Sequence, residues 1–111
     1  MKKPDILRNK QDFNRLYNKG NSSGSKYVVL LCIKNGLTYN RKAFLASKKV
    51  GNSVKRHRAV RLMRESYRLL EPKFPQGYDL LFIARNTIND TKCADVKKSI
   101  EAASKRLGLL G

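Results

Sequence analysis

The chain has 111 residues, and its 25 lysines and arginines against 8 aspartates and glutamates give a formal net charge of +17 at pH 7. This length fits one domain, and a hydrophobic fraction of 41% is too high for a disordered tail. A compact domain with this excess of positive charge repels itself and gains free energy by binding a polyanion, so nucleic acid is the expected partner and an anionic membrane the competitor.

The chain begins with a segment that reads as a flexible basic arm over residues 1–8, followed by a short helix over about residues 9–18. Phe13, Leu16 and Tyr17 share one face of this helix at the i, i+3, i+4 spacing, and Gly20 suits its C-terminal end. Phe13 and Tyr17 are either core residues or an exposed platform on which unpaired bases stack. The pattern leaves both interpretations open.

Strands are expected in the middle of the chain. Residues 26–34 form the first strong strand, and Asn35 and Gly36 follow it as a turn signal. Residues 21–25 are a loop or a short irregular strand, residues 41–47 a second strand candidate, and residues 78–85 a third strong strand. The longest apolar run, residues 27–33, is far too short to span a bilayer. Tyr27, at its start, could join the two aromatic residues of the first helix.

The segment from residue 48 to residue 68 is the most informative part of the chain, because it carries eight basic residues against one acid, Glu65. Residues 53–70 are predicted to form an amphipathic helix. Its apolar face consists of Ala59, Val60, Met63, Tyr67 and Leu70. Its basic face consists of His57, Arg58, Arg61, Arg64 and Arg68. An ordinary solvated face usually mixes charges of both signs, so this one is predicted to contact nucleic acid, whose phosphates guanidinium binds through paired hydrogen bonds.

The start of this basic helix departs from the usual charge preference. A helix N-terminus favours aspartate or glutamate, whereas basic residues crowd the first turns here. The turn at Gly51 and Asn52 leaves free backbone N–H groups, which form a natural phosphate site, although both residues also suit a plain helix cap. The predicted RNA contacts are Lys48, Lys49, Asn52, Lys55, Arg56, His57, Arg58, Arg61, Arg64 and Arg68.

The last helix is expected over about residues 91–107, with an apolar stripe of Val96, Ile100, Ala103 and Leu107. The fold class is therefore α+β, a single RNA-binding domain over residues 1–111. Its order is α-β-β(-β)-α-β-α, in a small two-layer α/β sandwich with about four strands.

No self-sufficient catalytic site is predicted. His57 is the only histidine, which excludes a two-histidine ribonuclease mechanism, and no pair of carboxylates has the spacing of a metal-dependent nuclease. Phosphate-binding glycine motifs and a nucleophile elbow are absent from the sequence. Cys32 and Cys93 form no CxxC pair, so no metal residue is predicted and a reducing cytoplasm is the expected location. No signal peptide is evident.

The basic segment resembles the bacterial ribonuclease P protein subunit. That family carries a pattern S-K-K-x-G-x-A-V-x-R-N-R-x-K-R-x-x-R. The matching residues are Ser47, Lys48, Lys49, Gly51, Val54, Arg56, Arg58, Arg61 and Arg64. The chain departs from it at His57, where the family has Asn, and at Val60, where Lys is common. Residues 12–20 resemble the family's first helix, and residues 78–85 its last strand.

The resemblance implies the small subunit of a ribonucleoprotein endoribonuclease that removes 5′ leaders from precursor tRNA. The catalytic RNA would hold the active site and most of the Mg²⁺, the arginine-rich helix would grip that RNA, and a cleft would bind the single-stranded leader. By this match Phe13 and Tyr17 line the cleft, with Tyr27 a weaker candidate. It also implies a left-handed crossover around the basic helix, where general rules favour a right-handed one.

Two other functions fit part of the pattern. A ribosomal or other structural RNA-binding protein would share the charge and the basic helix without a role in processing. A double-stranded DNA reader would need a second helix a few residues before the recognition helix. A strand is predicted there instead, so DNA is not an expected partner.

Overall fold

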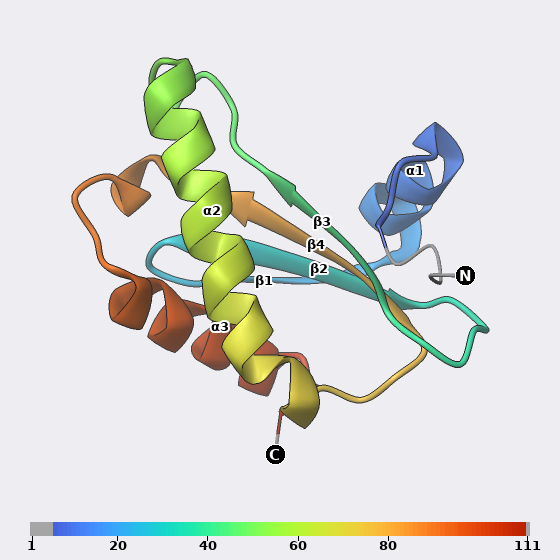
Figure 1. The fold of residues 1–111 in the computed structure, drawn as a ribbon. Helices are drawn as coiled ribbons and strands as arrows, with labels where there is room; N and C mark the ends of the chain where they lie inside the picture. The colour runs from blue at the N-terminus through green and yellow to red at the C-terminus, as the bar shows by residue number, and fades with distance from the viewer. Residues whose placement is uncertain (1–5, 111) are drawn as a thin grey trace, which may run out of the picture.

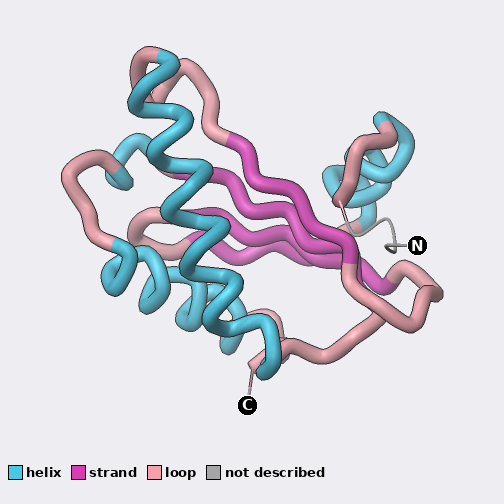
Figure 2. Tube along the Cα trace, in the orientation of Figure 1, coloured by secondary structure: helices cyan, strands magenta, loops and turns pink. Residues whose placement is uncertain are grey.

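A four-stranded mixed sheet lies at the centre of the computed structural model, which describes residues 6–110 (Figures 1 and 2). The spatial order of its strands is β1-β2-β4-β3, in which β2 pairs antiparallel with β1 and β4, and β3 pairs parallel with β4. The strands are β1 (Asn21–Gly24), β2 (Val28–Lys34), β3 (Arg41–Leu45) and β4 (Tyr78–Ala84). The helices are α1 (Lys10–Lys19), α2 (Ser53–Leu70) and α3 (Cys93–Arg106), with short 3-10 helices η1 (Glu71–Lys73) and η2 (Asn86–Ile88).

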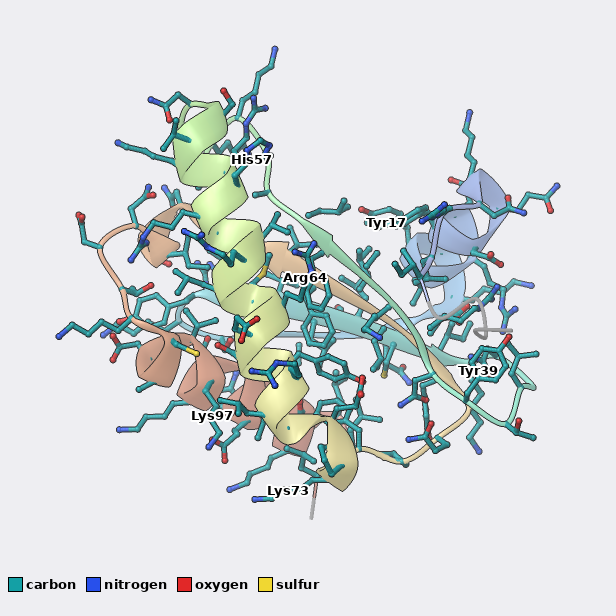
Figure 3. The ribbon with its side chains drawn as sticks, in the orientation of Figure 1. Tyr17, Tyr39, His57, Arg64, Lys73 and Lys97 are labelled. Carbon is teal, nitrogen blue, oxygen red and sulfur yellow. The ribbon has the colours of Figure 1, made fainter. Side chains whose placement is uncertain are left out.

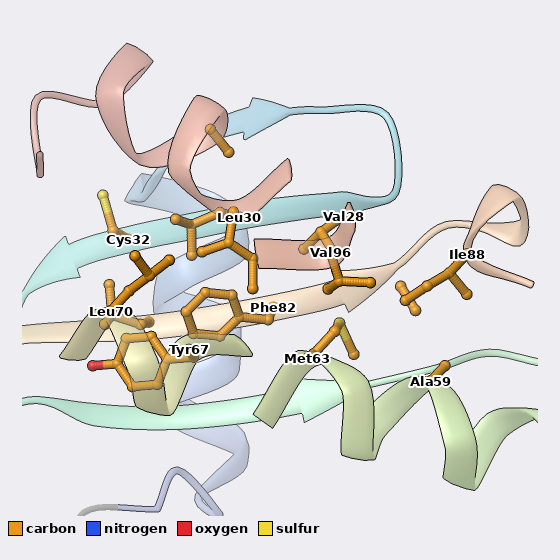
Figure 4. Packing of buried hydrophobic residues seen from close by; sticks show 14 of the residues in the cluster. Val28, Leu30, Cys32, Ala59, Met63, Tyr67, Leu70, Phe82, Ile88 and Val96 are labelled. Carbon is orange, nitrogen blue, oxygen red and sulfur yellow. The ribbon is translucent and has the colours of Figure 1, made fainter. Parts of the chain in front are cut away.

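Both faces of the sheet are covered, because alternate residues of the strands are apolar on both sides. Leu30 and Phe82 belong to the larger core, which lies under α2 and α3 (Figure 4). Leu31 and Leu81 point the other way and join Leu16 of α1 in a smaller apolar cluster. The expected α/β sandwich is therefore present, and α1 adds a partial cover on its second face.

The chain passes from β3 through α2 to the parallel neighbour β4. In Figure 1, α2 lies in front of the sheet and both strands run toward the upper left, with β4 on the lower-left side of β3. A crossover in this sense is left-handed, as the family resemblance implies and in contrast to the general preference.

The C-terminal end of helix α1 lies close against the sheet. The N–H of Gly20 donates to the carbonyl of Leu16 at 2.9 Å, and the chain enters β1 at the next residue. A Cβ on Gly20 would lie 2.5 Å from that carbonyl oxygen, so only glycine fits between the helix end and the sheet.

A polar cluster also ties α1 to the sheet. The Arg41 guanidinium binds both oxygens of the buried Asp79 at 2.8 Å and Asp12 of α1 at 3.2 Å. The Asn35 amide donates to the same Asp79 carboxylate at 3.0 Å. These contacts, the Asp79 hydrogen bonds above all, raise the pKa of Arg41 above its ordinary value. We call this group of four residues the Arg41 clamp.

The predicted elements agree with the structure apart from their ends. α2 spans the predicted residues and is capped by Asn52, and residues 21–24 form a strand rather than a loop. α3 begins two residues later than expected, where Asp95 accepts a hydrogen bond from the Lys92 N–H. Residues 1–5 of the expected basic arm lie outside the described residues. The end of that arm is not free, because Leu7 is buried and its N–H donates to the Lys42 carbonyl at 2.8 Å.

Candidate nucleic-acid interface

One side of α2 is locked into the larger core, which fixes the direction of the opposite side. Ala59, Met63, Tyr67 and Leu70 are each at most 1% exposed. The centroid of the Tyr67 ring lies 5.0 Å from that of Phe82 (Figure 4). It lies 5.1 Å from the centroid of the Phe74 ring. Rotating the helix would remove these aromatic contacts, so the residues on its outer side are held in place.

The outer side of α2 is cationic and almost free of compensating acid. His57, Arg61 and Arg64 are exposed, and between residues 6 and 110 no ion pair involves them. Arg68 is paired with Glu65, at 2.9 Å, and both side chains are well exposed. An exposed pair of this kind contributes little to stability, and Glu65 offsets one positive charge at one position of this face. A shallow depression lined by Val54, His57, Arg58, Val60, Arg61 and Arg64 follows the same side.

Two of the predicted contact residues are less exposed than the helical pattern indicates. Arg58 is half-buried, and its Nη2 donates to the Thr91 carbonyl in the loop before α3. Its guanidinium therefore lies on the flank of the outer face. Arg56 is also half-buried. Val60 packs against the larger core as predicted, while its exposed part lines the depression.

The N-terminus of α2 combines backbone donors with basic side chains. The Asn52 side chain accepts a hydrogen bond from the Lys55 N–H at 3.0 Å, and the first turn contains no acid. Gly51 has a φ of 142°, and a Cβ there would lie 2.6 Å from the Lys55 Cδ. The exposed Lys48 and Lys49 lie in the preceding turn. A helix start without its usual acid is suited to an external anion such as phosphate.

A groove of about 370 Å³ lies over the edge strand β3, between α1 and α2. Its lining comprises Ile6, Leu7, Phe13, Lys42, Ala43, Phe44, Leu45 and Arg64. Its volume is at the lower end of the range for small-ligand sites. Lys42 and Phe44 were not singled out in the sequence, although the alternation within residues 41–45 indicates that both face the α2 side of the sheet.

The structure separates the three aromatic residues that were expected to share a cleft. Phe13 is half-buried in the groove wall, and Tyr17, one turn along α1, is 54% exposed. In the view of Figure 3, Tyr17 lies on the side of α1 that is turned toward α2. Tyr27 lies elsewhere, beside α3, where its N–H donates to the Ser99 hydroxyl at 3.0 Å. The expectation that Tyr27 joins Phe13 and Tyr17 is therefore wrong.

Within residues 6–110, no three histidine, cysteine, aspartate or glutamate side chains gather as a metal site. None of the helices there has the length and apolar character needed to cross a bilayer.

A rigid cationic helix beside a groove with an aromatic wall, both carried by a small mixed sheet, defines a nucleic-acid-binding α+β protein. The sequence model of the family described as Ribonuclease P matches residues 1–108. The ribonuclease P protein component of Alkaliphilus oremlandii is 41% identical over 110 residues, which cover 99% of this chain and 96% of that protein. That of Clostridium botulinum (strain Loch Maree) is 43% identical over 110 residues, 98% of each chain. The chain belongs to the ribonuclease P protein family.

Solved structures show the same fold. The RNase P protein of Staphylococcus aureus, solved at 2.0 Å, superposes with a TM-score of 0.86 at 26% identity, covering 98% of this chain and 100% of that one. The Thermotoga maritima protein gives a TM-score of 0.79 at 27% identity, with 87% and 92% coverage. Membership makes this chain a protein subunit of the endoribonuclease ribonuclease P, in which the RNA subunit catalyses the cleavage of precursor tRNA.

Proposed function

We propose that the outer face and N-terminus of α2 dock on the catalytic RNA of ribonuclease P, and that the groove over β3 receives the single-stranded 5′ leader of precursor tRNA. The proposal rests on the cationic face of α2. The aromatic core holds this helix in place, and Glu65 is the one acidic residue within α2. The packed core fixes the backbone from which the arginine side chains of α2 extend, and the planar guanidinium fork loses less conformational entropy per hydrogen bond than a lysine ammonium does.

The groove suits a single strand because it offers an aromatic wall and a cation together. Phe13 lies in its wall, and Arg64 borders it from α2. Tyr17, one turn along α1 from Phe13, is exposed on the side of that helix turned toward α2. Unpaired bases stack on aromatic side chains, and each stacked base contributes about 1–3 kcal/mol. The strand would thus be held by stacking on α1 and by charge from α2.

The protein's role in the reaction is binding and charge screening, with the active site in the RNA. We assign the Mg²⁺ ions mainly to the RNA and its substrate. Positive charge between the catalytic RNA and its substrate reduces their mutual repulsion, so the Mg²⁺ concentration needed for cleavage should fall when the protein is present. The cytoplasm, where precursor tRNA is made in bacteria, is the proposed location.

Binding to the catalytic RNA is tested by removing two charges from α2. The Arg61→Gln/Arg64→Gln variant should bind the RNA at least about tenfold more weakly. The slope of log affinity against log salt should fall by about 1.4–1.8, since each of the two phosphate contacts contributes roughly 0.7–0.9. Lys34→Gln/Lys73→Gln removes the same charge from residues that line neither the depression on the outer side of α2 nor the groove, and is the matched control. If both variants lose the same affinity for the catalytic RNA, with the same change in salt slope, the proposal that α2 binds this RNA is contradicted.

Leader binding is tested with Tyr17→Ala, because Tyr17 is exposed and its loss should leave the fold intact. The variant should bind precursor tRNA about 5- to 100-fold more weakly in the reconstituted holoenzyme, and mature tRNA as the wild type does. Asn18→Ala, on the neighbouring exposed residue, is the control. An equal loss for precursor and mature tRNA would contradict the leader assignment.

A further inference from the structure

A second basic depression, of about 350 Å³, lies between the β1–β2 turn and α3. Its lining comprises Ser25, Lys26, Tyr27, Asp95, Lys98, Ser99, Ala102 and Arg106. α3 packs over β1 and β2, whereas α2 packs on the same face over β3 and β4, toward the opposite edge of the sheet (Figure 1). None of the α2 residues predicted to bind RNA takes part in it.

The floor of this depression is a rigid polar network with its hydrogen bonds satisfied. The Tyr27 N–H donates to the Ser99 hydroxyl at 3.0 Å, and the Ser99 and Ser25 hydroxyls bond to each other. The Ser25 hydroxyl donates in turn to the Val28 carbonyl at 2.7 Å. Both serines are buried, so the backbone of the turn is fixed against α3.

Three successive carbonyls of the same turn are bound by side chains from elsewhere in the chain. Arg106 donates to the Gly24 carbonyl, Arg85 donates to the Ser25 carbonyl at 2.8 Å, and the Thr87 hydroxyl donates to the Lys26 carbonyl. Two guanidinium groups are thus positioned by neutral acceptors, which leaves their positive charge uncompensated. Each also keeps N–H groups that these hydrogen bonds do not use.

The depression carries three cations against one carboxylate. Lys26, Lys98 and Arg106 line it, and within residues 6–110 none of them forms an ion pair. The carboxylate, Asp95, is engaged at the start of α3 by the Lys92 N–H at 3.0 Å. The Lys26 ammonium lies over the half-buried Tyr27 ring, 5.4 Å from its centroid, so a cation and an aromatic face lie together.

We propose that this depression is a second RNA-binding site, which grips the phosphodiester backbone with Lys26, Lys98 and Arg106. The inference rests on the proposed function for its partner, an RNA of the ribonuclease P assembly. Docking on an anionic membrane would need bulky apolar residues around the cations, whereas the small Ala102 lies among them on α3. The subunit then binds RNA from both sides of its helical layer and joins two RNA segments.

The test removes two exposed charges from the depression. Lys26→Gln/Lys98→Gln changes side chains that make no hydrogen bond in the described part of the chain, so the fold should persist, which a thermal melt checks. Lys34→Gln/Lys73→Gln is the control for equal loss of charge. Affinity is measured over a range of salt concentrations for the catalytic RNA alone and for precursor tRNA alone.

For one of the two RNAs the slope of log affinity against log salt should fall by about 0.7–1.8, because one or two phosphate contacts are lost. At 0.15 M salt this corresponds to an affinity about 4- to 30-fold weaker, and the RNA that shows the effect identifies the source of the phosphates. Curves that coincide with the control for both RNAs would overturn the proposal, and would leave an acidic protein surface as the alternative partner.

Combining the change with Arg61→Gln/Arg64→Gln tests whether the two sites are independent. Their fold losses should multiply to within about twofold, because distant sites act additively in free energy. If the Lys26 and Lys98 changes have no effect once α2 is altered, both belong to one site and the proposal fails. An effect of Lys26 and Lys98 without any effect of Arg61 and Arg64 would instead contradict the role of α2.

Discussion

The guanidinium carbon of Arg64 on α2 lies 5.8 Å from the ring centroid of Phe44 on β3. Phe44 in turn stacks on Phe82 of β4, with 5.1 Å between centroids and 16° between ring planes. Arg64 also borders the groove over β3 while it belongs to the cationic face of α2. The two proposed RNA-binding surfaces therefore meet at this one side chain, whose position depends on the aromatic stack.

Replacing Arg64 by lysine keeps the charge and removes the planar group over Phe44. We expect the free energy of unfolding to fall by about 0.5–1 kcal/mol, the contribution of an exposed cation–π contact. Urea denaturation of Arg64→Lys, Phe44→Leu and the double variant gives the coupling between the two residues. A coupling below about 0.3 kcal/mol would contradict the contact, and the salt slope of RNA binding should stay as in the wild type.

Glu65 is the one acid on the outer side of α2, so its removal should strengthen RNA binding. Glu65→Gln frees Arg68 from its ion pair, and we expect affinity for the catalytic RNA to rise about two- to fivefold at low salt. Stability should stay close to that of the wild type, because the pair is exposed. Glu101→Gln on α3 is the control for the change in net charge. Equal gains from both variants would show that only net charge matters.

The Arg41 clamp should matter both for stability and for the position of α1. Arg41→Met leaves the Asp79 carboxylate, 1% exposed, with the Asn35 amide as its remaining side-chain partner among residues 6–110, so we expect the free energy of unfolding to fall by about 3 kcal/mol. Arg41→Met/Asp79→Leu should recover most of this loss, since an apolar pair replaces a buried ion pair with little cost. Chemical denaturation measures both variants.

The same clamp separates the two proposed binding activities. Because Arg41 also holds Asp12 of α1, the recovered double variant should bind precursor tRNA more weakly while binding the catalytic RNA as before. Asp12→Asn alters only the half-exposed end of the Arg41 clamp and should lower the free energy of unfolding by less than about 1 kcal/mol. Normal leader binding by the recovered double variant would show that the clamp does not position the groove wall.

Cys32 makes stability sensitive to high pH. It is 3% exposed, and burial raises the pKa of its thiol because the thiolate is disfavoured away from water. In the unfolded chain the thiol titrates near pH 8.5. The contribution of the buried, neutral thiol to the free energy of unfolding is therefore complete below that pH, and it is lost as the pH rises through the folded pKa. Under reducing conditions, wild type should lose stability relative to Cys32→Val above about pH 8.5. Parallel curves between pH 7 and pH 10 would contradict this.

Local pattern was sufficient to predict the elements that carry the charge. The two-faced pattern of residues 53–70 predicted α2 to the residue, since apolar spacing and the cap at Asn52 agree. The first helix and the two long strands were predicted for the same reason. Residues 21–25 are too few to show such a periodicity. Their strand conformation depends on the pairing of β1 with β2.

The directions of side chains at the ends of helices and strands, and the contacts between distant segments, could not be predicted from the sequence. Tyr27 precedes β2, so strand alternation does not fix the face to which it points. Arg58 lies at the border of the helical face, and a carbonyl 33 residues away draws it to the flank. The Arg41 clamp joins residues 38 positions apart, and the groove needs α1, β3 and α2 together. These features arise from topology, which no local spacing encodes.

The smaller apolar cluster has a consequence for heat tolerance. Helix α1 is attached to the sheet by the Arg41 clamp and by Leu16, which shares the smaller cluster with Leu7, Leu31, Ala43 and Leu81, whereas α2 and α3 share the much larger core. Detachment of α1 alone then needs less free energy than global unfolding. On warming, the subunit should stop distinguishing precursor from mature tRNA several degrees before it releases the catalytic RNA, so an assembled particle can remain intact after substrate selection is lost.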